Sequence, residues 1–208
     1  MNHDFFVTGT DTNVGKTVLS ALLCAALDAA YWKPIQTGAP AERDRQTVTA
    51  LAELPAHRTL EEAYVFEPPV SPHLAAQLAG IPIHLDRITR PDTSVRLVIE
   101  GAGGVLVPIN ESELMLDLMR RLGVPIIVAS RTSLGTINHT LLTVRCLRDA
   151  SLPVAGVVLI GEESPANRAA IERFGNVPVI GWIPKLDVMN RAVLLDVFER
   201  HFDKSCFK

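Results

Sequence analysis

The sequence predicts an α/β protein with a doubly wound, mostly parallel sheet between two layers of helices. Six short runs rich in β-branched residues are almost continuously apolar, as strands covered on both faces must be. Segments with apolar residues at helical spacing alternate with these runs. Such alternation implies right-handed β-α-β crossovers in a three-layer α/β/α fold, whose ligands bind beyond the carboxyl ends of the strands. We therefore expect function in the loops that lead from strand to helix.

The expected elements follow one another along the whole chain. The strands are residues 4–9, 30–35, 95–101, 125–130, 154–161 and 178–184. The helices are residues 16–28, 71–80, 111–122, 136–150, 165–174 and 190–202. A proline-rich stretch, FEPPVSPH at 66–73, is expected to be a surface loop before a short helix. Because the 208 residues contain no internal repeat or linker, we expect one domain, residues 1–208.

Composition argues against several classes of partner. The net charge is -3 and the lysines and arginines are scattered, so we expect no nucleic-acid partner. The start, MNHDFFVTG, lacks the pattern of a signal peptide, and no apolar run approaches the roughly 20 residues that cross a bilayer. We expect a cytoplasmic protein without a membrane partner. Cys24, Cys146 and Cys206 are too widely spaced to indicate a disulfide framework or a zinc site.

The most informative stretch is GTDTNVGKT, Gly9 to Thr17, between the first strand and the first helix. In that context the amide groups of the loop and the helix dipole favour a phosphate, and Gly15 allows the backbone to approach it. Lys16 is expected to contact β- and γ-phosphate oxygens, and Thr17 to offer its hydroxyl to Mg²⁺. The pattern indicates a P-loop NTPase-like fold, although Thr10 stands where the usual motif has a glycine. The alternative is an ordinary glycine turn before a helix.

Two acidic residues are candidates for the same site. Glu100 ends the apolar run VRLVIE and resembles the acid that holds Mg²⁺ in such proteins, with Gly101, Gly103 and Gly104 after it. The alternative for Glu100 is a charge that emerges into solvent at the end of a strand. Asp44 precedes a helical pattern, and taken alone it is best explained as a helix N-cap.

Lys33 interrupts the run AYWKPI, which is otherwise suited to a buried strand. A buried ammonium needs an anionic partner, and Pro34 places this lysine at the carboxyl edge of the sheet. A second lysine near the phosphates indicates more negative charge than a nucleotide alone supplies. The alternative is an edge-strand lysine whose ammonium reaches solvent.

These stretches together resemble the dethiobiotin synthetase family. TGTDTNVGKT, YWKPIQTG, SPHLAA, VIEGAGGVLVPI, LGTINHTLLT and GWIPKL occur in that family's order over residues 8 to 186. The resemblance implies a ligase that forms C–N bonds, acting on 7,8-diaminononanoate, CO₂ and ATP with Mg²⁺. The amine takes up CO₂ as a carbamate, ATP activates it as a carbamic-phosphoric anhydride, and ring closure gives dethiobiotin for biotin biosynthesis.

The resemblance also implies the residues of the site. It assigns catalysis to Lys16, Lys33 and Thr12, and the metal to Thr17, Asp44 and Glu100. It assigns the nucleotide to Asn13, Val14, Gly15, Lys16, Thr17, Val18, Glu100, Gly103, Gly161, Pro184, Lys185 and Leu186. It assigns the substrate to Thr12, Lys33, Thr37, Gly135, Thr136, Ile137 and Asn138.

Two further implications concern assembly and the nucleobase. In the family, the helix start at Gly135–Asn138 receives the substrate carboxylate across a dimer interface, so a homodimer with composite sites is expected. Taken alone, Thr136 is equally suited to be a helix N-cap, with Ile137 and Leu141 buried. The family often reads adenine with an asparagine where this chain has Gly161, and the best-known members have an acid where this chain has Asn13.

Three other functions stay open at this point. One is a partition or septum-placement ATPase or the iron protein of nitrogenase, although Asp11 stands where those have a signature lysine. Another is a relative of the amidotransferases of cobalamin synthesis, which normally carry a further glutaminase domain. The last is a nucleotide-binding module without catalytic activity.

Overall fold

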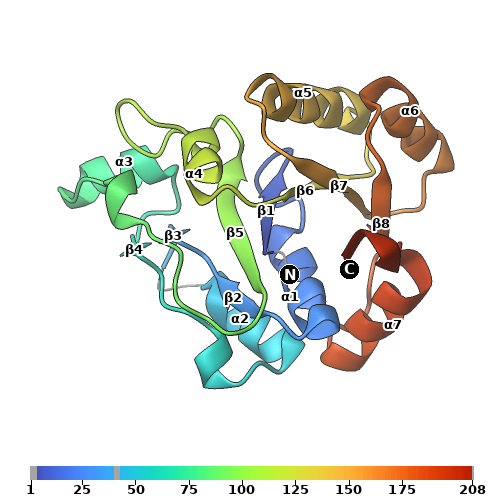
Figure 1. The fold of residues 1–208 in the computed structure, drawn as a ribbon, viewed down its shortest axis with the longest axis horizontal. Helices are drawn as coiled ribbons and strands as arrows, with labels where there is room; N and C mark the ends of the chain where they lie inside the picture. The colour runs from blue at the N-terminus through green and yellow to red at the C-terminus, as the bar shows by residue number, and fades with distance from the viewer. Residues whose placement is uncertain (1–3, 40–42, 208) are drawn as a thin grey trace.

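The computed structural model describes residues 4–39 and 43–207, and a six-stranded parallel sheet forms its centre (Figure 1). The strand order is β2-β5-β1-β6-β7-β8. The bounds are β1 Phe5–Gly9, β2 Ala30–Trp32, β5 Leu97–Gly104, β6 Ile126–Arg131, β7 Val154–Ile160 and β8 Val179–Ile183. This confirms the predicted doubly wound sheet, because the order reverses on either side of β1.

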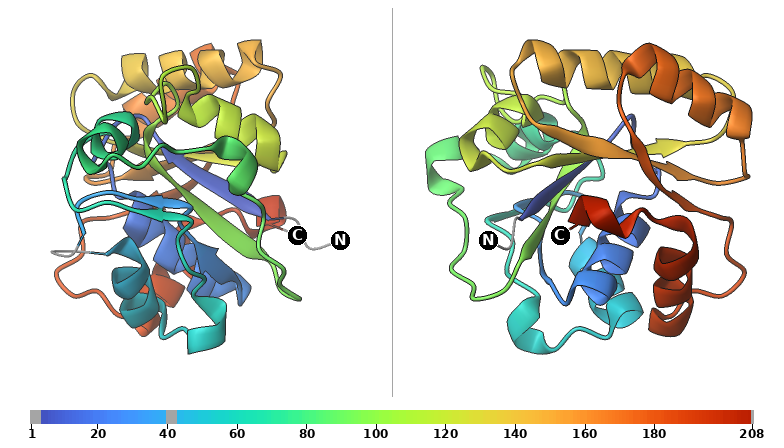
Figure 2. Two further views of the ribbon diagram at one scale, coloured as in Figure 1. Left: turned by 90° about the vertical axis from the view of Figure 1, so that its left-hand side faces the viewer. Right: turned by 45° about the vertical axis from the view of Figure 1, so that its right-hand side comes forward.

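Helices cover both faces of the sheet, which confirms the predicted three layers (Figure 2). One core packs α1, α2 and α7 against the sheet, and the other packs α3, α4, α5 and α6 against the opposite face. The helix bounds are α1 Lys16–Leu27, α2 Asp44–Ala52, α3 Pro72–Ala79, α4 Met115–Leu122, α5 Thr136–Asp149, α6 Pro165–Gly175 and α7 Arg191–His201. Each strand of the sheet is therefore buried on two sides, as its continuous apolar sequence requires.

Most bounds agree with the sequence prediction to within one or two residues, but some elements differ more. Residues 30–35 do not form one strand, because Pro34 cannot donate a ladder hydrogen bond; β2 ends at Trp32, and β3 (Ile35–Gln36) pairs instead with β4 (Tyr64–Val65). The predicted helix at 111–122 begins only at Met115, because Leu114 forms a bridge with Pro108. β5 extends beyond the predicted end at residue 101 and includes the glycines up to Gly104. The predicted helix ranges did not include α2 at residues 44–52.

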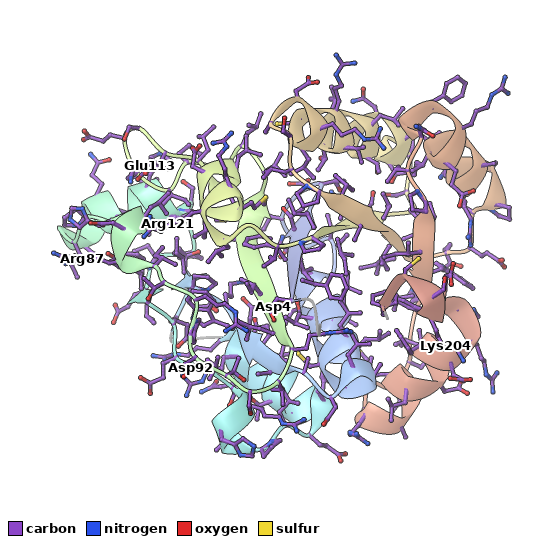
Figure 3. All side chains as sticks on the ribbon, viewed as in Figure 1. Asp4, Arg87, Asp92, Glu113, Arg121 and Lys204 are labelled. Carbon is purple, nitrogen blue, oxygen red and sulfur yellow. The ribbon has the colours of Figure 1, made fainter. Side chains whose placement is uncertain are left out.

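Short elements and one acid hold the ends of the fold in place. The 3₁₀ turns are η1 Ala56–Arg58, η2 Leu85–Arg87 and η3 Lys204–Phe207. Figure 3 shows Asp4 between β1 and β5, where its Oδ1 accepts a hydrogen bond from the Leu97 amide at 2.9 Å. Its Oδ2 accepts one from Arg90 Nε at 2.5 Å.

Among the helices of the described ranges, none combines the length and apolar character needed to span a membrane.

Candidate active site

The loop between β1 and α1 has the backbone of a phosphate site. Gly15 adopts φ +96°, a left-handed conformation that favours glycine, and a Cβ there would lie 2.9 Å from Ile160 Cδ1. The helix begins directly afterwards at Lys16, so its first amide groups face the loop. Lys16 is 7% exposed and donates a hydrogen bond to the Asp11 carbonyl at 3.1 Å. Burial lowers the pKa of Lys16 to about 8 even though Glu100 opposes the change.

Thr17 lies between the two acidic candidates. Its Oγ1 is 2.7 Å from Asp44 Oδ1 and 3.1 Å from Glu100 Oε1. Glu100 is 1% exposed, so it is not a strand-end charge in solvent. The N-cap of α2 is Arg43, and Asp44 is the first residue of the helix. The capping explanation for Asp44 is therefore wrong, because its carboxylate is turned to Thr17 and Lys33 instead.

Lys33 is buried directly beside these carboxylates. Its Nζ lies 2.5 Å from Asp44 Oδ2 and 3.1 Å from Glu100 Oε1, and the residue is 6% exposed. The alternative of an edge lysine reaching solvent is wrong. Burial alone would lower the pKa of Lys33, but Glu100 and Asp44 together outweigh it and raise the pKa. The ammonium therefore stays charged, and it lies near enough to Lys16 to help lower that residue's pKa.

Most of the predicted residues line one cavity of about 890 Å³. They are Thr12, Asn13, Gly15, Lys16, Thr17, Val18, Lys33, Thr37, Asp44, Glu100 and Gly103. The sequence did not predict the rest of the wall, which consists of Gln36, Gly38, Thr47, Ala102, Val107 and residues 69–72. The prolines of 69–72 were the available signal, because an irregular loop that follows a strand often carries function.

A second cavity of about 480 Å³ adjoins the phosphate loop, since Val18 lines both. Gly161, Pro184, Lys185 and Leu186 line it as predicted from the resemblance, together with Arg131, Thr132 and Ser133, which were not predicted. Gly161 adopts φ +129°, and a Cβ there would lie 2.6 Å from Thr132 Oγ1. Its carbonyl accepts a hydrogen bond from Trp182 Nε1 at 2.9 Å.

Five predicted residues lie outside both cavities. Val14 is buried in the core beside α1. Gly135, Thr136, Ile137 and Asn138 lie at the start of α5, where Gly135 is the N-cap. Thr136 is therefore not the N-cap; its buried hydroxyl contacts Ser130 Oγ and the Arg131 carbonyl instead. Ile137 and Leu141 are only half-buried, so that α5 start is largely open to solvent.

Two observations show whether the oxygen-bearing side chains of this cavity could bind a metal ion. The described residues contain no group of three or more His, Cys, Asp or Glu side chains that could hold an ion. Thr17, Asp44 and Glu100 nevertheless bring oxygen atoms together beside a phosphate loop. Mg²⁺ takes oxygen ligands and typically uses one or two carboxylates together with substrate phosphates and water. The set therefore fits Mg²⁺ bound with a nucleotide.

Comparison with known proteins decides the family. A family model described as an AAA domain matches residues 3–193. The ATP-dependent dethiobiotin synthetase BioD of Rhodopseudomonas palustris is 43% identical over 207 residues, covering 100% of this chain and 97% of the relative. That of Brucella ovis is 46% identical over 202 residues, covering 97% and 95%. The chain belongs to the dethiobiotin synthetase family.

Other similarities extend this assignment. The biotin biosynthesis bifunctional protein BioCD of Bordetella avium is 52% identical over 196 residues, which are 94% of this chain but 42% of that protein. Among solved structures, the septum site-determining protein MinD of Pyrococcus horikoshii with Mg-ADP has a TM-score of 0.57 at 14% identity, covering 94% and 86%. A ParA family ATPase of Chlorobium tepidum has a TM-score of 0.57 at 11% identity, covering 90% and 86%. At these identities the ATPases share the fold alone, whereas the dethiobiotin synthetases are 43% and 46% identical over nearly the whole chain.

Proposed function

We propose that this chain is an ATP-dependent dethiobiotin synthetase that carboxylates 7,8-diaminononanoate and closes the ureido ring in biotin biosynthesis. The observation that carries the proposal is the single cavity that Lys16 and Lys33 line together with Thr17, Asp44 and Glu100. A phosphate loop alone would need only the first of these lysines. The second lysine, buried at the end of β2, provides positive charge for a second anion beside the γ-phosphate.

The proposed reaction has three balanced steps. One amine attacks CO₂ and loses a proton, which gives a carbamate. A carbamate oxygen then attacks the γ-phosphorus, the bond to ADP breaks, and a carbamic-phosphoric anhydride forms. The second amine attacks the carbonyl carbon and loses a proton, and the bond from that carbon to the phosphate oxygen breaks, which closes the ring and releases phosphate. No covalent bond to the protein is needed, so catalysis consists of positioning and charge stabilisation.

The two lysines have distinct roles in this scheme. Lys16 holds the transferred phosphoryl group, as the corresponding lysine does in proteins with this loop. Lys33 lines the same cavity as the phosphate loop, and its proposed role there is to reduce the repulsion between carbamate and phosphate. Thr12 and Thr37 line the same cavity and are the proposed hydroxyl contacts to the diamine and its carbamate. Phosphoryl transfer also needs Mg²⁺ to neutralise phosphate charge, and Thr17, Asp44 and Glu100 are its proposed ligands.

The nucleoside end of ATP is assigned to the second cavity. Val18 joins that cavity to the phosphate loop, and Pro184, Lys185 and Leu186 line its wall. Gly161 offers no side-chain amide there, so recognition of the base would rest on backbone groups and on Thr132.

We assign the start of α5 to binding the carboxylate of the substrate that lies in the active site of a second copy of the chain. Gly135 to Asn138 lie outside both cavities of their own chain, and helix amide groups there favour an anion. A homodimer would bring this helix start to the partner's diamine. We further assign the chain one domain and a cytoplasmic location with small-molecule substrates, and the net charge of -3 argues against nucleic acid.

Phosphate release from MgATP tests the proposal. Release should require both 7,8-diaminononanoate and bicarbonate, and equal release without the diamine would reject the synthetase function. K16A should abolish turnover, and K33A should lower it at least 100-fold, roughly the cost of losing one electrostatic contact in a transition state, while nucleotide binding persists. K204A removes a distant lysine with a half-exposed side chain and should behave as the wild type. Repeating the assay with GTP and CTP measures how far the cavity around Gly161 selects the base.

A further inference from the structure

The two carboxylate oxygens of Glu100 have different neighbours. Oε1 accepts hydrogen bonds from Thr17 Oγ1 and Lys33 Nζ, both at 3.1 Å. Oε2 accepts one from the Tyr31 hydroxyl, also at 3.1 Å. Glu100 lines the large cavity, whereas Tyr31 does not and is fully buried. One oxygen therefore faces the site and the other is held from within the core.

Tyr31 is well placed to hold that oxygen firmly. It lies in the middle of β2, where it pairs with Val98 of β5, two residues before Glu100. Its ring belongs to the core formed with α1, among Leu19, Leu23 and Cys24. The Tyr31 side chain is therefore fixed by both its strand and the core around its ring.

We infer that Tyr31 is a positioning residue that presents only Oε1 of Glu100 to a divalent cation and thereby favours Mg²⁺ over Ca²⁺. The inference rests on the proposed function, because it takes the metal site from it. Mg²⁺ requires near-ideal octahedral geometry, whereas Ca²⁺ is larger and often takes both oxygens of a carboxylate. The hydrogen bond from Tyr31 to Oε2 opposes the rotation of the Glu100 carboxylate that would turn both of its oxygens toward the cation. Partners of this kind orient metal ligands, and their loss typically weakens metal binding by about 10- to 100-fold.

The chain supplies a matched control for removing one tyrosine hydroxyl. It contains two tyrosines, and the other is Tyr64. The Tyr64 hydroxyl accepts a hydrogen bond from the His84 amide at 3.1 Å, and its ring stacks on Phe66. Tyr64 lines neither of the two cavities described above. Y64F therefore removes the same atom from a hydrogen bond that has no contact with Glu100.

Calorimetric titration with Mg²⁺ and Ca²⁺, on protein saturated with the nonhydrolysable ATP analogue AMP-PNP, tests the inference without turnover. In Y31F the Mg²⁺ affinity should fall about tenfold or more. The Ca²⁺ affinity should fall less, so that the preference for Mg²⁺ shrinks. Y64F should keep both wild-type affinities. An unchanged preference in Y31F, or an equal loss in Y64F, would overturn the inference.

The result separates this inference from the proposed function. If the wild-type chain binds AMP-PNP but neither cation, the metal part of the proposed function fails and the inference fails with it. If the wild type binds both cations and Y31F keeps the wild-type preference, only the inference fails.

A second measurement leaves the Tyr31 ring and hydroxyl in place. Incorporating 3-fluorotyrosine into Y64F labels Tyr31 alone, since the chain has two tyrosines. The ¹⁹F resonance should differ between the Mg²⁺ and Ca²⁺ complexes with AMP-PNP, because the carboxylate that it contacts is held differently. Identical resonances in the two complexes would count against the inference.

Discussion

At the scale of single residues, Lys33 is the centre of a buried charge network. It contacts Asp44 and Glu100, and Thr17 contacts the same two carboxylates. One positive charge therefore faces two negative charges before any ligand is added. A divalent cation at these carboxylates would compete with Lys33 for them, so the lysine and the metal should substitute for one another in stabilising the fold.

K33A tests that substitution. It leaves two carboxylates without their cation, and breaking a buried pair of this kind costs about 3–5 kcal/mol of unfolding free energy. The proposed Mg²⁺ site is formed only in the folded chain, so adding Mg²⁺ should restore part of this loss in K33A. Urea unfolding with EDTA or with Mg²⁺ measures both effects. K204A removes an exposed ion pair and should change stability by no more than about 1 kcal/mol in either condition. Equal stability of K33A and wild type in EDTA would contradict this account.

Lys16 predicts a pH dependence for nucleotide binding. Its pKa in the free protein is lowered to about 8, mainly by burial, so its charge is lost as the pH rises through that value. Phosphates favour the ammonium form, and affinity for AMP-PNP should therefore fall above pH 8 while binding takes up a proton. The stability of the nucleotide-free protein depends on pH in the opposite direction, because its unfolding free energy rises with pH over this range. The unfolded state holds this proton up to its ordinary pKa of 10.5, so raising the pH between the two values favours folding.

Titration calorimetry between pH 7 and about 9.5, in buffers of different ionisation enthalpy, measures the affinity and the proton uptake. K16R is the matched variant, because its guanidinium stays charged throughout and should give an affinity that does not vary with pH. A wild-type affinity that stays constant over the same range would refute the role of Lys16 ionisation.

At the scale of elements, the strands of the main sheet could be predicted because burial on both faces leaves a continuous apolar signature. β3 and β4 could not be, since two residues each are too short to show any periodicity. The helix expected at 111–122 lost its first turn to a bridge between Pro108 and Leu114, a contact that apolar spacing cannot reveal.

The same distinction holds for the candidate site. Lys33 and Glu100 were predicted from sequence because each stands at the end of an apolar run, and such ends meet at one edge of a parallel sheet. Lys16 and Thr17 were predicted from the glycine-containing loop motif between the first strand and the first helix. Roles that depend on side-chain contacts between strands leave no such mark. Thr132, whose hydroxyl occupies the space that a Cβ at position 161 would need, is one of these.

The last turn, η3, provides a prediction about packing between elements. Phe207 is 4% exposed, contacts the rings of Phe198 and Phe5, and its carbonyl accepts a hydrogen bond from Arg96 at 2.8 Å. F207A should therefore lower the unfolding free energy by about 3–5 kcal/mol. Phe174 is 70% exposed, so F174A is the control and should change it by less than about 0.5 kcal/mol. Urea unfolding measures both, and similar losses in the two variants would contradict the packing of η3.

At the scale of the whole molecule, the proposed substrate site has two parts that lie apart within one chain. The phosphate loop and Lys33 line one cavity, and the helix start that is assigned to the carboxylate lies outside it. Leu134, directly before that helix, is fully exposed, and Leu142 on the same helix is 61% exposed. Apolar residues exposed in this way are suited to contact with another chain.

A homodimer with composite sites makes a quantitative prediction. K33A damages the phosphate side of each site, and Asn138→Glu places a repelling charge at the carboxylate side. If one site draws on both chains, a mixed dimer of the two variants has one fully native site and one doubly altered site. Random mixing makes half of the dimers mixed, so a one-to-one mixture should regain about a quarter of the wild-type activity. Each variant alone should stay nearly inactive.

Refolding the two variants together and then assaying phosphate release with diamine and bicarbonate measures the recovery, with the two variants refolded separately and mixed afterwards as the control for exchange. Light scattering gives the mass of each sample, so recovery can be compared with dimer content. If every site were built from one chain, no pairing could create an intact one, and activity would stay at the average of the two variants. That result in a dimeric sample would contradict a site shared between the two chains, and it would leave the function assigned to Lys16 and Lys33 untouched.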